Sequence, residues 1–424
     1  WLDGDGDYLD GGDFAATLVV ALSGDRVVAL PDFARGPGQT INVPALGSGL
    51  PIVISDAAGA TAVDVWVEFD PALLSIADAA KAPGLPADWA LTKNLGASNS
   101  GLVKLTLSGT TPLSGSNVPL VVLSADVPAD APYGASHLVR LTHLRVNEDA
   151  IAAQADMAIH KVTYLGDVDG DGDYGAFDAA FISRVVVELD SGFDAHDWTD
   201  PLIVGDATGD GTLSGLDASY VAQKAALLPR PEIPDLPGIP LAPETTGADP
   251  QLIIDDEIQA YVGQEVVIPV RLDIQPAETG VYGASFRVEF DPAVLSIDAL
   301  TGVLPGADWP AGDWNITANQ VEPGRLMVIV SGTEASSVGL REIARLRFAV
   351  NTTARGNTLT PLDVNPKLPA EGGLTWTDDD GSLRIAARVV EGGRRVFYNE
   401  SVFDGESAAA DANDDMAIAA DKVA

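Results

Sequence analysis

The chain has 424 residues, 46% of them hydrophobic, which indicates two to four folded domains rather than a disordered chain. Its formal net charge of −38 argues against nucleic acid and anionic membranes as partners, because both require a cationic surface. The absence of cysteine excludes disulfides, thiol catalysis and cysteine-ligated zinc, and no run of 18 apolar residues is present that could insert into a membrane.

Residues 1–22 contain an acidic loop followed by an apolar stretch that is predicted to be a helix. The acids match ligand positions of a calcium loop, with one residue inserted before the last, but Trp1 stands at the first position and cannot ligate. The candidate ligands are Asp3, Asp5, Asp7 and Asp13. Because the chain begins inside this motif and without Met, we expect it to be part of a longer protein.

Residues 23–40 are predicted to be a short linker, because they contain Pro31, Gly36, Pro37 and Gly38. Residues 41–162 are predicted to be a β domain of short Val-, Ile- and Leu-rich runs separated by turn residues. In one run Val65 and Val67 alternate with Trp66, which places the valines in a core and Trp66 on the outer face. Trp is enriched at binding hot spots, so Trp66 is a candidate partner-binding residue.

Residues 163–228 carry two loops with the ligand spacing of an EF-hand, including a Gly where the loop must turn sharply. Hard carboxylate oxygens in this arrangement surround a hard cation, so Ca²⁺ is the predicted cofactor. The candidate ligands are Asp167, Asp169, Asp171, Asp173 and Asp178 in the first loop, and Asp206, Thr208, Asp210, Thr212 and Asp217 in the second. Thr208 is a weaker ligand than an acid, so we expect the second site to be the weaker one. A helix is predicted after each loop, over 178–189 and 217–228.

Residues 229–250 are rich in proline and are predicted to form a semi-rigid spacer that holds two halves of the chain apart. Residues 251–387 repeat the first β domain: the run VWVEFDPALLSI that begins at Val65 returns as FRVEFDPAVLSI, beginning at Phe286. The outer position of Trp66 becomes Arg287, a second candidate partner-binding residue.

These features resemble two known families. Loop–helix pairs without a helix in front of each loop are similar to a dockerin module, and the repeated strand is similar to that of cohesin domains, whose family fold is a jelly-roll sandwich. The resemblance implies a mainly β protein with two cohesin-like sandwiches alternating with small α calcium modules. Residues 388–424 are expected to open a further module or to be a docking tail.

The dockerin resemblance also implies where a partner binds, because in that family loop positions 10 and 11 and the following helix face the cohesin. The matching residues suggest an apolar contact centred on Phe177 and Leu216, with Arg184 or Lys224 at its rim. The alternative is that Phe177 packs only within its own helix pair.

Recognition rather than catalysis is the predicted activity. The four histidines have no metal-ligand spacing, and no P-loop, HExxH or nucleophile-elbow motif occurs, so we expect no enzyme. The resemblance implies an extracellular or cell-surface, calcium-dependent scaffold or adhesion protein whose partners are other copies of itself or proteins bearing cohesins or dockerins. Pairing between chains would give head-to-tail filaments, and pairing within a chain a compact rod. The alternative function is a carbohydrate-binding accessory protein of a polysaccharide-degrading complex.

Overall fold

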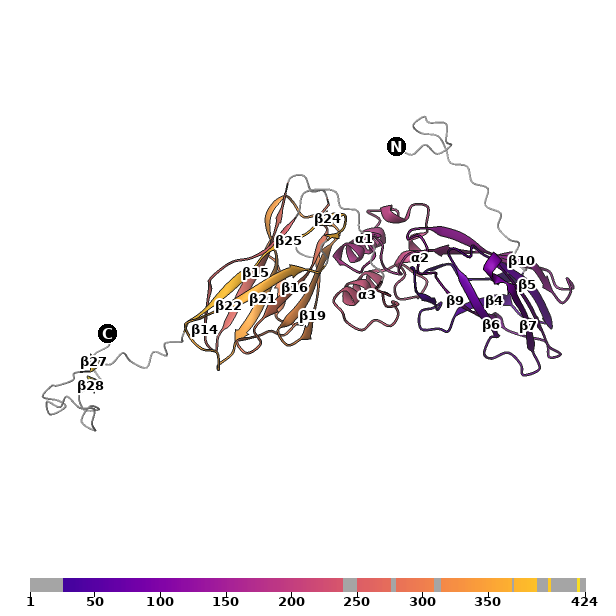
Figure 1. Ribbon diagram of the computed structural model, residues 1–424, viewed down its shortest axis with the longest axis horizontal. Coiled ribbons are helices and arrows are strands. Elements are labelled where there is room, and N and C mark those ends of the chain that lie inside the picture. Colours follow the sequence, from indigo (N-terminus) through magenta and orange to yellow (C-terminus); the bar gives the residue numbers. More distant parts are fainter. Residues whose placement is uncertain are drawn as a thin grey trace, which may run out of the picture.

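The part of the chain that the computed structural model describes comprises residues 26–238, 250–275, 280–308, 314–367 and 370–386, with the short strands β27 (Val396–Phe397) and β28 (Ile418–Ala419). Two β-sandwiches lie end to end with a small helical module between them (Figure 1). The predicted module of residues 1–22, and with it four candidate calcium ligands, lies outside the described residues. Among the described helices, none has the length and apolar character needed to cross a bilayer.

The first sandwich consists of two six-stranded sheets. The first sheet contains β11 (Ala153–Asp156), β1 (Arg26–Ala29), β4 (Leu50–Asp56), β9 (Ser116–Asp126), β3 (Thr40–Ile41) and β6 (Ser75–Lys81). The second contains β2 (Phe33–Ala34), β12 (Ala158–Lys161), β10 (Ser136–Val146), β5 (Ala62–Glu68), β8 (Leu102–Ser108) and β7 (Ala90–Ala97). Val65 and Val67 are 2% and 0% exposed, which confirms the predicted core face of their strand.

The prediction that residues 23–40 are a linker is wrong from Arg26 onward. Strand β1 pairs in parallel with β11 and antiparallel with β4, so this segment supplies an internal strand of the first sheet, next to the edge strand β11. The Gly36–Gly38 turn joins strands instead of separating domains, and Gly38 N–H donates to the carbonyl of Val127 (3.0 Å). Turn residues mark a change of chain direction, and their presence alone does not show whether the flanking residues pair.

The second sandwich repeats this topology. Its first sheet contains β17 (Leu295–Ser296), β21 (Gly339–Val350), β15 (Glu265–Ile274), β13 (Gln251–Ile254), β25 (Thr377–Asp379) and β18 (Val303–Pro305). Its second contains β14 (Ile258–Tyr261), β26 (Gly381–Ala386), β22 (Thr358–Pro366), β16 (Gly283–Phe290), β20 (Arg325–Gly332) and β19 (Trp314–Glu322). A separate hairpin pairs β23 (Ala370–Glu371) with β24 (Leu374–Thr375).

The pairing of neighbouring strands shows which positions of the two sandwiches are equivalent. In the first, the outer residues of β5 lie opposite Lys104 and Thr106 of β8. In the second, the equivalent residues of β16 lie opposite Met327 and Ile329 of β20. Met327 and Ile329 are buried beneath the helical module. The two sandwiches thus share the pattern of their cores, while two outer positions are polar in β8 of the first and apolar in β20 of the second.

The helical module, residues 163–228, contains α1 (Ala176–Val186), α2 (Pro201–Gly205) and α3 (Gly215–Ala225). Helices α1 and α3 pack against each other and follow the two loops, which confirms the predicted helices. Each begins two residues earlier than predicted, because the last acid of each loop also caps its helix. Asp178 accepts a hydrogen bond from the backbone N–H of Gly175 (2.7 Å), and Asp217 accepts one from that of Ser214 (2.8 Å).

The Pro-rich segment does not act as an extended strut in its described part, residues 229–238. Ile233 is 1% exposed in the module's own core, and its carbonyl accepts a hydrogen bond from Lys224 Nζ (2.9 Å). The Tyr174 hydroxyl donates to the carbonyl of Pro234 (3.1 Å). Burial of one isoleucine and these backbone contacts fold the segment onto the module, so the spacer prediction is wrong for these residues.

Candidate metal centre and module contact

The first loop, residues 167–178, folds around its own carboxylates. Asp167 accepts a hydrogen bond from the backbone N–H of Gly172 (2.8 Å), and Asp178 closes the loop onto Gly175. Gly172 has a φ of 90°, so the predicted sharp turn uses a conformation that favours glycine. The loop backbone therefore holds the acidic side chains on its inner side.

Three of these carboxylates converge. Single ligand oxygens of Asp167, Asp169 and Asp171 all lie within 4.8 Å of one another. Asp169 Oδ2 is buried and accepts a hydrogen bond from none of the described residues. The donor set consists only of hard oxygen atoms, and it leaves one buried oxygen without a donor, so these residues fit a hard cation such as Ca²⁺.

The electrostatics of the first loop agree with that fit. Burial, together with the carboxylates of Asp169 and Asp167, raises the pKa of Asp171 to about 10. Burial and neighbouring acids also raise the pKa of Asp167 and of Asp178 well above the usual range. Like charges this close cannot all stay ionised unless a cation compensates them.

The second loop, residues 206–217, repeats the same bonding. Asp206 accepts from the backbone N–H of Gly211 (2.8 Å), and Asp217 accepts from that of Thr208 (2.9 Å). Its surroundings differ, because Asp210 is exposed to solvent whereas the equivalent Asp171 is half-buried. The predicted ligand Thr212 is also exposed and donates from both N–H and hydroxyl to Asp210.

The first sandwich contacts the first loop through Tyr133, whose hydroxyl donates a hydrogen bond to Asp167. The same hydroxyl accepts from the backbone N–H of Tyr164 (3.1 Å). Tyr164 is 1% exposed, and a Cβ at Gly36 would lie 2.2 Å from its ring, so only glycine allows this approach. Behind the loop, His196 Nε2 lies 2.9 Å from the carbonyl oxygen of Asp167.

The second sandwich contacts the same loop from the other side. Lys367 Nζ lies 2.9 Å from a carboxylate oxygen of Asp173. Glu371 is 1% exposed, and its Oε1 accepts from the backbone N–H of Ala176 (2.6 Å) and from the hydroxyl of Ser285 (2.8 Å). Burial raises the pKa of Glu371. A buried carboxylate of the sandwich thus binds the first turn of α1, where the helix dipole favours negative charge.

Phe177 is the apolar centre of this contact. It is 1% exposed and belongs to the core of the second sandwich, where its ring meets those of Trp376 (6.5 Å) and Tyr282 (6.4 Å) edge to face. Gly372 has a φ of 62°, and a Cβ there would lie 2.4 Å from the Phe177 ring. The glycine therefore makes room for the phenylalanine.

The four residues expected to form one partner surface separate into two pairs. Arg184 lies beside Phe177 at the module contact, with its guanidinium 4.6 Å from the ring centroid of Tyr282. Leu216 is 51% exposed, and Lys224 pairs with Asp235 of the Pro-rich segment (2.5 Å). The prediction of a single contact centred on Phe177 and Leu216 is therefore wrong, because only the first loop–helix unit faces the sandwich with these positions.

Trp66 lies on the outer face of its strand, as predicted, but its own sandwich covers it. Its ring stacks on His143 with centroids 4.5 Å apart, and Lys104 Nζ lies 3.8 Å from the ring centroid. Arg287, at the equivalent position, pairs with Glu289 (2.8 Å). Both positions stay candidates for contacts with other chains.

Sequence reasoning missed Tyr133, Lys367 and Glu371. Each lies in a β domain, 34 to 195 residues from the module atom it binds. An isolated Tyr, Lys or Glu in a strand or turn carries no local pattern that would indicate such a role.

A pair of histidines in the first sandwich is expected to make its stability depend on pH. His160 is fully buried, with Nδ1 2.9 Å from His137 Nε2 and Nε2 3.3 Å from the carbonyl oxygen of Arg35. Burial, together with the neighbouring His137, lowers the pKa of His160 to about 3, and burial also lowers that of His137.

Because these folded-state pKa values lie below the ordinary value near ~6.5, the unfolded chain binds more protons. We expect the free energy of unfolding to fall as the pH drops from ~6.5 toward ~4, by about 1.4 kcal/mol per pH unit for each extra proton. Urea denaturation at pH 7 and pH 5 measures this loss, and His160→Gln should reduce it. An equal loss in both proteins would contradict the expectation.

The comparisons with known proteins concern the sandwiches. A family model described as the cohesin domain matches residues 250–371. Among solved structures, the seventh ScaB type I cohesin of Pseudobacteroides cellulosolvens is 18% identical, covers 34% of this chain and 97% of its own, and has a TM-score of 0.29. A non-cellulosomal cohesin of Archaeoglobus fulgidus is 19% identical over 34% of this chain and 94% of its own, with a TM-score of 0.26. The third cohesin of ScaC from Acetivibrio cellulolyticus, solved in complex with the ScaB dockerin, is 21% identical, covers 32% of this chain and 99% of its own, and has a TM-score of 0.27. No curated protein matches the chain.

Proposed function

From the cohesin match over residues 250–371 and the contact that this sandwich makes with the helical module, we propose that the chain is an extracellular, calcium-dependent structural scaffold. Residues 163–228 act in it as a dockerin-like calcium module. Cohesin domains suggest a protein–protein scaffold role, and here the module and the sandwich that pair belong to the same chain.

The burial of Phe177 in the core of the second sandwich carries this proposal. A phenylalanine at position 11 of a calcium loop, packed into the neighbouring domain, couples the order of the loop to the position of that domain. The two sandwiches clamp the first loop from opposite sides, through Tyr133 and Lys367. Calcium held by the first loop would therefore stiffen the joint between the sandwiches, because metal binding contributes to folding free energy.

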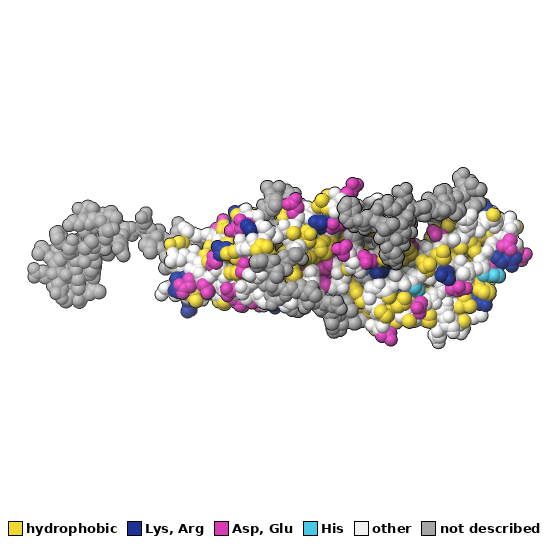
Figure 2. Space-filling model, turned by 90° about the horizontal axis from the view of Figure 1, so that it is seen from above, with side chains coloured by type: hydrophobic (Ala, Val, Ile, Leu, Met, Phe, Trp, Pro, Cys, Tyr) yellow, Lys and Arg dark blue, Asp and Glu magenta, His cyan; other side chains and the backbone are white. Residues whose placement is uncertain are grey.

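Pairing within the chain changes what assembly between chains requires. The face of α1 that meets the second sandwich is already covered, so a filament built on the same contact needs modules to exchange between chains. On the face shown in Figure 2, basic side chains lie interspersed with acidic and apolar ones. Protein partners on a cell surface fit such a surface better than nucleic acid does.

Small-angle X-ray scattering and sedimentation of the whole chain in 1 mM Ca²⁺ and in chelator test the proposal. We expect a monomeric rod in calcium, and a larger radius of gyration with a lower melting temperature in chelator. Identical scattering and melting in the two conditions would refute calcium dependence. Polymers that form in calcium and dissolve in chelator would instead establish pairing between chains.

A further inference from the structure

A tyrosine that belongs to the first sandwich reaches the first loop of the helical module. Tyr133 lies in the connection between β9 and β10, and the backbone around it is fixed to the residue that follows β12. The N–H of Gly134 donates to the carbonyl of Val162 (2.8 Å), and the N–H of Val162 donates to that of Ala135 (2.8 Å). The Tyr133 hydroxyl donates to Oδ2 of Asp167. The sandwich therefore holds the tyrosine, while its hydroxyl binds a carboxylate of the module.

The hydrogen bonds of this hydroxyl determine where its proton points. It accepts from the backbone N–H of Tyr164 (3.1 Å) and from the hydroxyl of Thr163 (2.8 Å). An ionised carboxylate can only accept, so the one proton of Tyr133 is donated to Asp167. The three contacts fix the hydroxyl as a donor to the first carboxylate of the loop.

The donors around Asp167 leave it one direction for a cation. Its side chain is fully buried, and an ionised carboxylate has about four lone-pair positions, shared equally by its two oxygens. Oδ2 accepts from the backbone N–H of Gly172 (2.8 Å) and from Tyr133, so both of its positions are filled. Oδ1 accepts from the backbone N–H of Gly170 (2.8 Å) and keeps its other position. Tyr133 thus leaves Oδ1 as the oxygen that can face a metal.

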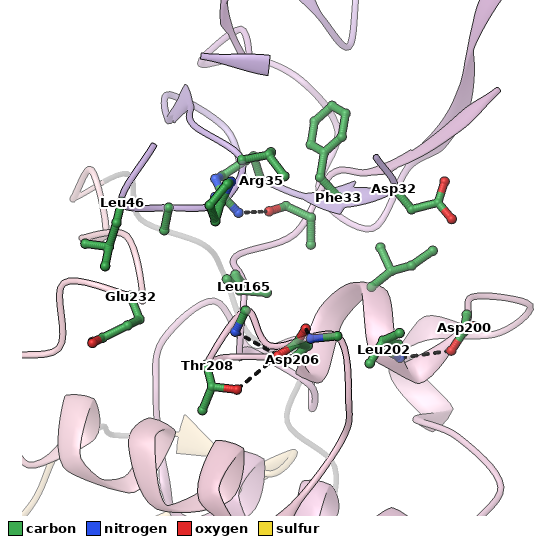
Figure 3. Close-up of a pocket in the computed structure, with 17 residues that line it drawn as sticks. Asp32, Phe33, Arg35, Leu46, Leu165, Asp200, Leu202, Asp206, Thr208 and Glu232 are labelled. Carbon is green, nitrogen blue, oxygen red and sulfur yellow. Dashed lines mark hydrogen bonds between the residues drawn. The ribbon is translucent and has the colours of Figure 1, made fainter. Parts of the chain in front are cut away.

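The second loop has no such donor from a sandwich among the described residues. Its equivalent carboxylate, Asp206, lies on the wall of a cavity between the first sandwich and the module (Figure 3). The donors that bind Asp206 all belong to its own loop, and they come from Thr208, Gly209, Asp210 and Gly211. Two loops with one motif therefore differ in what the neighbouring domain supplies.

We infer that Tyr133 is a positioning residue for the metal of the first loop, so that the first sandwich sets the calcium affinity of a site that it does not itself contain. The inference rests on the proposed calcium role of residues 163–228. Groups that orient a metal ligand through a hydrogen bond typically change affinity about 10- to 100-fold when they are removed. Coupling is reciprocal, so calcium at Asp167 strengthens the contact with Tyr133 by the same factor.

Isothermal titration of the whole chain with Ca²⁺ tests this inference, in an Asp206→Ala background that removes the first ligand of the second loop. Asp167→Ala in the same background identifies the binding step that belongs to the first loop. Tyr133→Phe keeps the ring and removes only the hydroxyl, and we expect it to raise the dissociation constant of that step at least tenfold. Circular dichroism confirms that each variant folds.

Tyr174→Phe is the matched control. It also removes a buried tyrosine hydroxyl from the same region, but that hydroxyl donates to the carbonyl of Pro234 (3.1 Å) rather than to a carboxylate. We expect the dissociation constant of the first-loop step to change less than threefold. Equal weakening by the two substitutions would overturn the inference, because a general loosening of the module would then explain both.

Melting temperatures in chelator separate positioning from mere support of the fold. Tyr133→Phe deprives Thr163 and Tyr164 of an acceptor, so a lower melting temperature is expected in any case. A lower melting temperature with an unchanged calcium affinity would assign Tyr133 a structural role only, which overturns the inference and leaves the calcium proposal intact. If Asp167→Ala removes no binding step, the first loop binds no calcium, and both the inference and the proposed function fail.

Discussion

Replacing Asp171 by Asn is expected to destabilise the chain in calcium and to stabilise it in chelator. In calcium, the loss of one ligand charge should weaken binding about 100-fold, or ~2.7 kcal/mol, and ligand-linked stability falls by the same amount when the site was saturated. In chelator, the substitution removes a half-buried carboxylate that other acids repel, as its raised pKa of about 10 indicates. Melting temperatures in 1 mM Ca²⁺ and in chelator measure both effects.

The matched control is Asp210→Asn, at the same position of the second loop. Asp210 is exposed, so water compensates its charge and its replacement should change the melting temperature less in calcium and hardly at all in chelator. Equal effects of the two substitutions would mean that the clamped first loop is not the main metal centre. A loss of stability for Asp171→Asn in chelator would contradict the repulsion argument.

Replacing Phe177 by Ala is expected to separate the helical module from the second sandwich. The ring is 1% exposed among Trp376, Tyr282 and Phe181, and deletion of such a side chain typically costs about 3–5 kcal/mol. Urea denaturation should show the loss, and scattering in calcium should show a longer, more variable particle.

Leu216→Ala is the control, since Leu216 holds the equivalent loop position and is 51% exposed. Its cost should stay within about 0.5 kcal/mol. If the two substitutions cost the same, or if Phe177→Ala leaves the scattering curve unchanged, Phe177 does not join the module to the sandwich.

Local chemistry is what the sequence predicts well here. The spacing of acids around Gly172 predicts the loop conformation, because a turn with positive φ and nearby acceptors is a property of a few adjacent residues. Alternation predicts the core face of β5 for the same reason. The first residues of α1 and α3 could have been found from the capping acids, since an acid three residues into a helix is a known start signal.

Long-range contacts are what the sequence could not supply. Phe177 holds the same loop position as Leu216, and Phe177 is buried only because it packs into the core of the second sandwich. Ile233 lies in a proline-rich run whose composition indicates an extended spacer, yet a site in the module core buries it. Tyr133 and Glu371, which bind the helical module, belong to the two sandwiches. The periodicity of one segment cannot predict its contact with a distant segment.

The difference between the outer faces of the two sandwiches has a consequence for the order of parts along the molecule. Because the two sandwiches share one topology, each presents an equivalent outer face on which the helical module could dock. Met327 and Ile329 offer it an apolar surface, whereas Lys104 and Thr106 would force it to bury an ammonium group and a hydroxyl. Specificity is a difference of two affinities, so this penalty on the first sandwich adds to the favourable apolar contact on the second. Two residues of β20 therefore favour docking of the helical module on the second sandwich, which sets the order of the domains along the molecule.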